Sequence, residues 1–336
     1  MSKLRPGDVV EVRSAQEILG ALDTDASTEA MPFMPEMLQF VGQRFTVSRR
    51  VEKICDTARK SGGSRRMERT VYLDDLRCDG SAHGGCQAGC RIYWKEEWLR
   101  PVGEAFSAGE PDASDELGAR ARSATKRVRD VQGEPMETYR CQATEAPAAS
   151  TPLGWLAPGQ YVREVTSGNV AASHVASVLI RATGARWYGV TRMLASRALR
   201  AIHILGPRPE RKPVRSSRPS REIRVGDTVR VRELSEIRAT LDGRSRHRGL
   251  LFDSNEEGYW CGGTFTVQDR VERFIDDGTG EMIELSSDCL ILEGVACSGE
   301  RSVARRFCPR AIYPFWREDW LERVDDAPHR PSAADA

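Results

Sequence analysis

The sequence predicts a mainly β protein: two small barrels, produced by an internal duplication, joined by a helical and Pro/Arg-rich linker. The first observation behind this prediction is a motif order that occurs twice. Residues 5–13 (RPGDVVEVR) return as 224–232 (RVGDTVRVR), and residues 42–52 return as 262–272. The second is the alternation of apolar and polar residues within these motifs, which is typical of half-buried strands.

Shorter signals predict the elements between these strands. Ser14 and Glu17 are three residues apart and can form a capping box, so a short helix is expected over residues 14–19. In the second copy, residues 276–280 (DDGTG) separate two apolar runs and predict a hairpin turn. The opening Gly-Asp-x-Val-x-Val motif, a long first loop and about five short strands per copy resemble SH3-like barrels. This resemblance covers residues 5–102 and 223–324.

Each copy closes with an aromatic and acidic stretch, residues 93–99 and 315–321. The tryptophans of each stretch are four residues apart and would share one face of a helical turn. They could line a pocket for a ligand or plug the barrel core; the candidate binding residues are Trp94, Trp98, Trp316 and Trp320. The acidic neighbours, Glu96, Glu97, Glu318 and Asp319, are expected to form a solvated face because no nucleophile accompanies them.

Composition changes between and after the two copies. Residues 103–135 predict a flexible linker, residues 136–165 an extension docked on the first barrel, and residues 169–205 a helical segment. Residues 206–222 predict a basic, Pro-rich tether, and residues 325–336 a disordered tail.

Charge and hydropathy exclude several classes of protein. The 336 residues include 50 Lys and Arg against 49 Asp and Glu, a formal net charge of +1, so no overall attraction to nucleic acid or anionic membranes is expected. No apolar run is long enough to span a membrane, and residues 1–10 lack a signal-peptide core. We therefore expect a cytoplasmic protein, in which nine cysteines indicate metal binding or thiol chemistry rather than disulfides.

A glycine-rich loop carries the densest group of candidate metal ligands. It contains the thiols Cys78, Cys86 and Cys90, and the fourth ligand would be His83, Cys55 or Cys141; the second copy offers Cys261, Cys297 and Cys308. Zinc is the expected metal, and an iron–sulfur cluster is the alternative. The cysteines could instead be small buried residues, or disulfides could join Cys78 to Cys86 and Cys297 to Cys308.

Two further segments suggest partners. Residues 31–38 (MPFMPEML) are rich in Met and include Phe33 and Met34, which could contact another protein or fold back over the barrel. We expect the partner to be another protein. Residues 208–221 are basic and could contact nucleic acid, although no aromatic residue there can stack on bases.

Residues 32–37, 77–88, 139–145 and 308–314 resemble those of bacterial proteins with duplicated SH3-like barrels and Cys-rich loops. This resemblance implies no activity, and no catalytic residue is assigned. The sequence therefore favours a non-enzymatic binding or scaffold protein with metal-stiffened barrels. The alternatives are a redox or metal-dependent enzyme that uses the loop 78–90, and a nucleic-acid-binding accessory factor.

Overall fold

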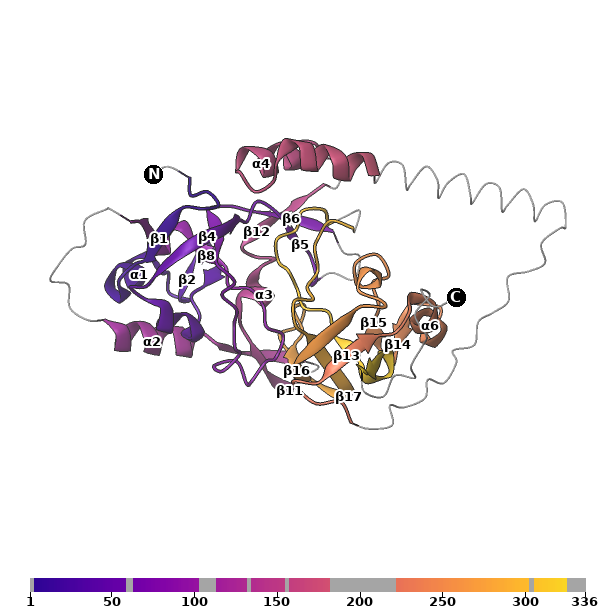
Figure 1. The fold of residues 1–336 in the computed structure, drawn as a ribbon. Helices are drawn as coiled ribbons and strands as arrows, with labels where there is room; N and C mark the ends of the chain where they lie inside the picture. Colours follow the sequence, from indigo (N-terminus) through magenta and orange to yellow (C-terminus); the bar gives the residue numbers. More distant parts are fainter. Residues whose placement is uncertain are drawn as a thin grey trace. The chain divides into compact units, whose positions relative to one another are not determined.

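The computed structural model describes residues 3–58, 63–102, 113–131, 134–154, 157–181, 222–301 and 305–324 (Figure 1). In these ranges the protein is mainly sheet, with few helices and with open antiparallel sheets. None of the described helices is long and apolar enough to cross a membrane.

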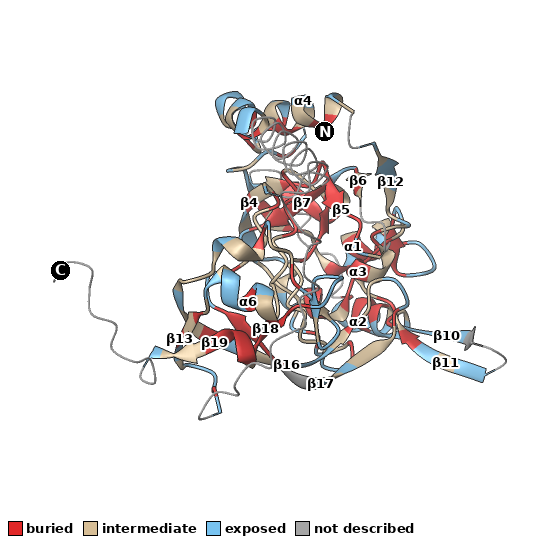
Figure 2. Cartoon of the chain, turned by 90° about the vertical axis from the view of Figure 1, so that its right-hand side faces the viewer, coloured by how far each residue is buried: buried red, intermediate tan, exposed pale blue. Residues whose placement is uncertain are grey.

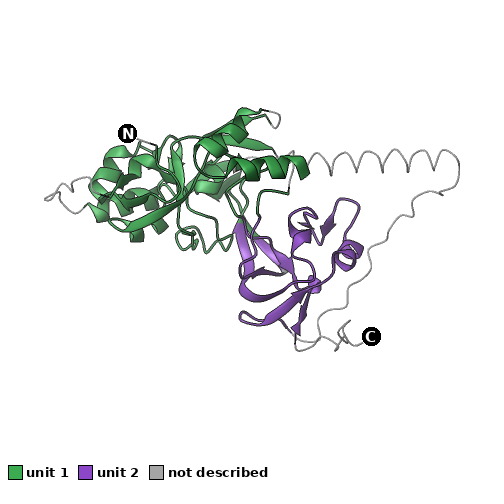
Figure 3. Ribbon diagram, turned by 45° about the horizontal axis from the view of Figure 1, so that its top comes forward, with its two compact units in different colours: residues 1–209, 275–283, 298–311 green, residues 210–274, 284–297, 312–336 purple. Residues whose placement is uncertain are grey.

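The chain divides into two compact units (Figure 3). Unit 1 consists of residues 1–209, 275–283 and 298–311, and unit 2 of residues 210–274, 284–297 and 312–336. The second half of the sequence therefore contributes two segments to unit 1: the tip of its long hairpin and a loop near its end.

The main sheet of unit 1 has the strand order β8-β7-β4-β1-β9. Its strands are β1 (Val9–Val12), β4 (Arg44–Arg50), β7 (Thr70–Leu73), β8 (Trp94–Lys95) and β9 (Leu99–Pro101). Val10 pairs with Phe45 on one side and with Pro101 on the other, so β1 is an inner strand. The short helix α1 (Ala15–Ala21) follows β1, and Ser14 and Glu17 form the predicted capping box, which is thereby confirmed.

The main sheet of unit 2 has the order β18-β17-β16-β13-β19. Its strands are β13 (Thr228–Val231), β16 (Thr264–Ile275), β17 (Met282–Leu292), β18 (Trp316–Arg317) and β19 (Leu321–Arg323). The hairpin predicted at residues 276–280 is confirmed, since it joins β16 to β17. The remaining elements of this half are α6 (Leu234–Thr240), β14 (Arg246–His247), β15 (Leu250–Leu251), η3 (Glu257–Tyr259) and η4 (Glu318–Trp320).

The closed SH3-like barrels that the sequence predicts are not found among the described residues. Each five-stranded sheet is open, with β8 and β9 at the edges of one sheet and β18 and β19 at the edges of the other. These edge strands have only two or three residues each. Among the described residues no ladder joins β8 to β9 or β18 to β19, so neither sheet closes on itself.

The segment predicted as a flexible linker, 103–135, contains ordered elements. Helix α2 (Ser114–Ser123) buries Leu117 and Ala121 against the unit 1 core, and β10 (Lys126–Val131) pairs with β11 (Glu134–Tyr139). The helix has acidic residues in its first turn and basic residues in its last, which complements the helix dipole. With so few large apolar residues, its order comes from tertiary packing rather than from a strong amphipathic pattern.

The predicted extension, 136–165, contacts several elements of unit 1. It includes α3 (Gln142–Glu145) and β12 (Ser150–Leu153), and α4 (Gly159–Thr166) begins within it. Strand β12 pairs with β6 (Ser64–Met67), which also pairs with β5 (Ile54–Cys55). The small elements β2 (Ser27–Thr28), β3 (Met31–Pro32), η1 (Pro35–Phe40) and η2 (Glu96–Trp98) complete the unit. Residues 182–205 of the predicted helical segment, residues 206–221 of the tether and the whole tail, 325–336, lie outside the described residues.

Each unit has its own apolar core (Figure 2). The four closing tryptophans are fully buried in these cores. Phe33 meets Trp98 edge to face at 5.4 Å, and Phe252 meets Trp320 at 5.3 Å. The indole N–H of Trp320 donates to Thr240 Oγ1 at 3.0 Å, so its one polar atom is satisfied.

Replacing Trp320 with Ala is expected to lower the free energy of unfolding by about 3–5 kcal/mol, because a cavity replaces a buried ring. Tyr259 belongs to the same unit, is 61% exposed and loses only an edge-to-face contact with Trp260, so Tyr259→Ala is the matched control and should cost about 1 kcal/mol. Urea unfolding of both variants measures the difference. Equal stabilities would contradict the placement of Trp320 in the core.

Candidate metal centre

The loop between β7 and β8 folds back on itself. Cys78 N–H donates to Cys90 O at 2.8 Å, and Arg77 and Arg91 form an isolated bridge beside it. Inside the loop, His83 N–H and Gly85 N–H both donate to Gly80 O. The loop is therefore a closed turn that fixes the direction of the His83 side chain.

Gly80 allows this turn for two reasons. Its φ of +69° lies in the left-handed region, and a Cβ at this position would overlap the backbone of Cys86. No other residue type fits without moving the loop.

A carboxylate from a distant segment meets this loop. Glu36 lies in η1, which begins at Pro35 after the extended residue Met34. Glu36, Cys78 and His83 each present one ligand atom, and these atoms lie within 4.8 Å of one another. Glu36 is 5% exposed and His83 is 1% exposed, whereas Cys78 is partly buried, so two of the three groups are covered.

The hydrogen bonds of His83 determine which ring nitrogen is free to bind a cation. Nε2 lies 3.1 Å from the carbonyl oxygen of Arg140, which can only accept, so Nε2 carries the hydrogen. Nδ1 lies 2.7 Å from Glu36 Oε1. In a neutral ring with the hydrogen on Nε2, Nδ1 and an ionised carboxylate oxygen both present lone pairs, so either a proton, on the ring or on the carboxyl, or a metal ion must lie between them.

The other two groups of the centre, the Glu36 carboxylate and the Cys78 thiol, both offer lone pairs to a cation. Glu36 Oε1 also accepts from Ala82 N–H at 3.1 Å, whereas Glu36 Oε2 is buried with no hydrogen-bond partner among the described residues. Burial raises the pKa of the Cys78 thiol far above its usual range, and the charge of Glu36 adds to this rise. The thiol is therefore protonated unless a cation displaces the proton.

The other predicted ligands do not join this group. Among the described residues, no further set of three His, Cys, Asp or Glu side chains comes close enough to hold a metal ion. Burial raises the pKa of Cys86, and raises that of Cys90 and Cys141 to about 12, as expected for protonated packing thiols. Cys55 and Cys308 lie together elsewhere in unit 1.

In the second copy, the predicted trio is divided between the two units. Cys261 and Cys297 belong to unit 2, whereas Cys308 belongs to unit 1. The Cys261 thiol faces Glu257 O at 3.9 Å, and Cys297 N–H donates to Ile312 O. All nine cysteines are free thiols, including the pairs considered as disulfides, Cys78 with Cys86 and Cys297 with Cys308.

The residues predicted to bind a partner lie inside the cores. Trp94, Trp98, Trp316 and Trp320 are 0% exposed, Phe33 is 1% exposed and Met34 is 3% exposed. In this conformation none of them presents a surface to a ligand.

Sequence reasoning missed two contributors to the centre, Glu36 and Arg140. Glu36 is the one charged residue in the apolar run 31–38, and an acid in such a run must find a compensating partner once it is buried. This pattern could have identified Glu36 as a candidate from the sequence. Arg140 contributes only a backbone carbonyl, which no sequence pattern marks.

Comparison of the chain with protein-family models, curated proteins and solved structures finds no match. The roles of Glu36, Cys78 and His83 are therefore inferred from their geometry.

Gly80→Ala is expected to lower stability by at least about 2 kcal/mol, because it combines a left-handed φ with a backbone overlap. Gly7 is the matched control: its φ is +94°, but a Cβ there would meet open space, so Gly7→Ala should cost about 1 kcal/mol. Thermal unfolding measures whether Gly80→Ala is less stable than Gly7→Ala. A Gly80 variant no less stable than the Gly7 variant would mean that the loop has no such constraint.

Proposed function

We propose that this is a non-enzymatic binding or scaffold protein whose unit 1 is stiffened by one zinc ion held by Glu36, Cys78 and His83. The observation that carries the proposal is the convergence of these three ligand atoms within 4.8 Å, with the second ring nitrogen of His83 tied to a backbone carbonyl. Metal-binding histidines almost always donate their other N–H to a carbonyl or carboxylate in this way. The arrangement thus provides both the ligands and the group that orients one of them.

A metal ion accounts for the centre better than a protonated histidine does. A charged imidazole ring would pair with Glu36 Oε1, but it would leave Glu36 Oε2 without a partner and the Cys78 thiol without a role. A divalent cation interacts with the carboxylate, the imidazole and a thiolate together. It also offsets the cost of burying the Glu36 charge.

The donor set favours zinc. Nitrogen, sulfur and oxygen ligands together suit a borderline metal with little geometric preference, whereas calcium and magnesium take oxygen ligands almost exclusively. In a tetrahedral site the nitrogen and oxygen would stand roughly 3.3 Å apart, so His83 and Glu36 must separate by about half an ångström from their present 2.7 Å. A water molecule or Glu36 Oε2 would complete the coordination.

The burial of the centre supports a structural rather than a catalytic role. Glu36 and His83 are almost completely covered and Cys78 is partly buried, which leaves little room for a substrate beside the ion. The ion would instead join η1, the loop 78–90 and, through Arg140 O, the segment that leads into α3. Joining segments so far apart in sequence restricts the unfolded chain, and metal binding of this kind contributes directly to folding free energy.

The proposal extends to the origin of the fold. The two main sheets would be SH3-like units that arose by duplication, as in the bacterial family that the sequence resembles. Support comes from the equivalent strand orders and from the edge-to-face pairs Phe33–Trp98 and Phe252–Trp320 at matching positions of the two copies. The partner of such a scaffold would be another protein, and its location the cytoplasm.

Metal content tests the proposal. The purified chain is expected to hold about one equivalent of zinc by elemental analysis, and Cys78→Ser and His83→Gln are each expected to lose most of it. Two cysteines outside the cluster serve as controls: Cys86→Ser in the same loop and Cys261→Ser in unit 2 should retain the full equivalent. Absence of zinc from the wild type, or full retention in Cys78→Ser, would overturn the proposal.

The same centre should release zinc as pH falls. Burial and Glu36 raise the pKa of Cys78 in the metal-free chain, so zinc binding must displace the thiol proton, and affinity drops with each fall in pH. Dialysis between about pH 8 and pH 5, followed by metal analysis, measures the release. A zinc content independent of pH over this range would show that no thiol proton is exchanged.

A further inference from the structure

A second pair of cysteines lies in unit 1, and it is independent of the proposed metal centre. Cys55 is the last residue of β5, and Cys308 lies in the segment 298–311. Cys55 N–H donates to Cys308 Sγ at 3.1 Å, which places the two side chains next to each other although 253 residues separate them. They are 4% and 5% exposed.

The loop that carries Cys308 is held in a tight turn. Phe307 N–H donates to Gly299 O at 2.8 Å, and a Cβ on Gly299, whose φ is +67°, would overlap Cys308 O. Phe307 is fully buried in a small core with Val175 and Val178. The position of the Cys308 sulfur is thus set by backbone and packing.

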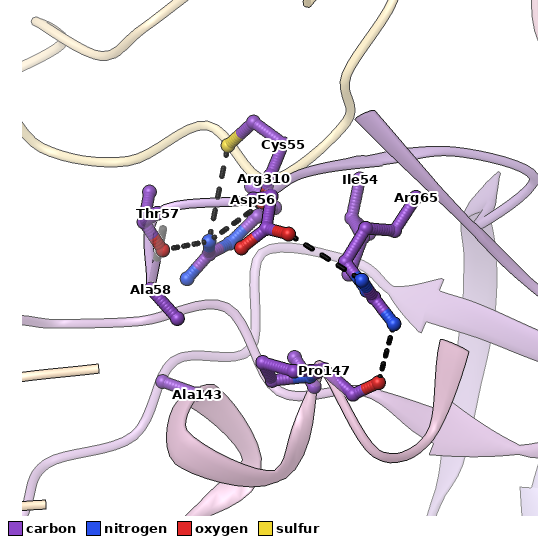
Figure 4. Close-up of a pocket in the computed structure, with 10 residues that line it drawn as sticks. Ile54, Cys55, Asp56, Thr57, Ala58, Arg65, Ala143, Pro147 and Arg310 are labelled. Carbon is purple, nitrogen blue, oxygen red and sulfur yellow. Dashed lines mark hydrogen bonds and ion pairs between the residues drawn. The ribbon is translucent and has the colours of Figure 1, made fainter. Parts of the chain in front are cut away.

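A guanidinium group lies beside the pair. Arg310 Nη1 is 3.8 Å from Cys55 Sγ, donates to Cys55 O at 3.2 Å and donates to Thr57 Oγ1 at 2.7 Å (Figure 4). Asp277 holds its other nitrogen at 3.2 Å. The cation is therefore fixed where it can stabilise a negative charge on the Cys55 sulfur.

These neighbours make the two thiols unequal. A hydrogen bond from Cys308, aided by Arg310 and Arg305, lowers the pKa of Cys55 to about 6 in spite of its burial. The pKa of Cys308 rises, because its proton is held in that hydrogen bond and burial opposes its loss. Because the Arg310 guanidinium contacts the Cys55 sulfur, we assign Cys55 as the nucleophilic thiolate and Cys308 as the proton-bearing partner.

A narrow pocket reaches Cys55. It is a shallow, half-open depression lined by Cys55, Thr57, Arg65, Pro147 and Arg310 among others (Figure 4), and its empty volume of about 180 Å³ includes open solvent. In this conformation it has no room for a water-sized molecule, so an oxidant would reach the Cys55 sulfur only when this part of unit 1 opens locally.

From this geometry we propose that Cys55 and Cys308 are a redox-active dithiol, which hydrogen peroxide oxidises to an intramolecular disulfide. The Cys55 thiolate attacks one peroxide oxygen and the O–O bond breaks. Cys55 becomes a sulfenic acid, and the departing oxygen leaves as water after taking up a proton. Cys308 then attacks the sulfenic sulfur and forms the S–S bond; the released hydroxide takes the Cys308 proton and leaves as a second water. Two thiols lose two electrons in all, and one peroxide gains them.

The product would be a covalent link inside unit 1 between β5 and the segment 298–311. That segment otherwise contacts β5 through hydrogen bonds from Cys55 N–H and from Arg310. Oxidation would therefore fix a contact that the reduced chain can open. The same guanidinium argues against a metal at this pair, because a cation bound to the sulfurs would lie close to Arg310.

Peptide mapping after peroxide treatment tests the proposal. The reduced full-length chain is treated with about one equivalent of hydrogen peroxide, its remaining thiols are alkylated, and it is digested with trypsin. The expected product is residues 54–59 joined to residues 307–310, two hydrogens lighter than the two reduced peptides. Loss of two thiols without this linked peptide, or no faster oxidation of this pair than of the other cysteines, would overturn the proposal.

Variants separate the proposed roles. Cys55→Ser and Cys308→Ser should each abolish the linked peptide, whereas Cys86→Ser and Cys261→Ser, which change neither this pair nor the zinc ligands, should form it at the wild-type rate. Arg310→Met should slow its formation about tenfold by raising the pKa of Cys55, and Arg310→Lys should restore part of the rate. If a folded Arg310→Met variant forms the linked peptide at the wild-type rate, the guanidinium does not activate Cys55.

The zinc ligands lie elsewhere in unit 1, so the metal content of Cys55→Ser is expected to stay at the wild-type value. The zinc proposal and the dithiol proposal therefore succeed or fail separately.

Discussion

The burial of the Glu36 carboxylate is the constraint on which the centre of unit 1 depends. A charged carboxylate in a covered site costs several kcal/mol unless a cation or several hydrogen bonds compensate it. The closed loop 78–90 supplies that compensation by presenting His83 and Ala82 N–H to the same oxygen. The tight turn at Gly80 and the carbonyl of Arg140 hold the imidazole in place.

Two cysteine sites in one unit show how charge assigns different chemistry to the same side chain. Cys78 lies beside a carboxylate, so its proton is held tightly and only a metal cation would displace it. Cys55 lies beside Arg310 and accepts a hydrogen bond from a second thiol, so its thiolate is favoured without a metal. An anionic neighbour recruits a cation, whereas a cationic neighbour repels one and activates the sulfur. The proposed zinc centre and the proposed dithiol follow from this difference.

The second half of the chain contributes directly to unit 1. Residues 275–283 place Asp277 against Arg310, and Gly280 O accepts from Tyr139 N–H at 2.7 Å. Residues 298–311 supply Cys308 and Arg310 themselves. Both segments belong to unit 1, although the sequence on either side of each belongs to unit 2.

The sequence by itself determined the local features. The capping box at Ser14 and Glu17, the hairpin at 276–280 and the predominance of strands could all be predicted, because each depends on neighbouring residues or on a short period. It also indicated that Cys78 and His83 belong to one loop. The tertiary structure alone decided that Glu36 joins them, that Cys55 meets Cys308 and that α2 is ordered, because each of these depends on contacts between segments far apart in the chain. Residue spacing cannot encode such contacts: burial and the resulting electrostatic cost are properties of the packed core, and they exist only after the chain has folded.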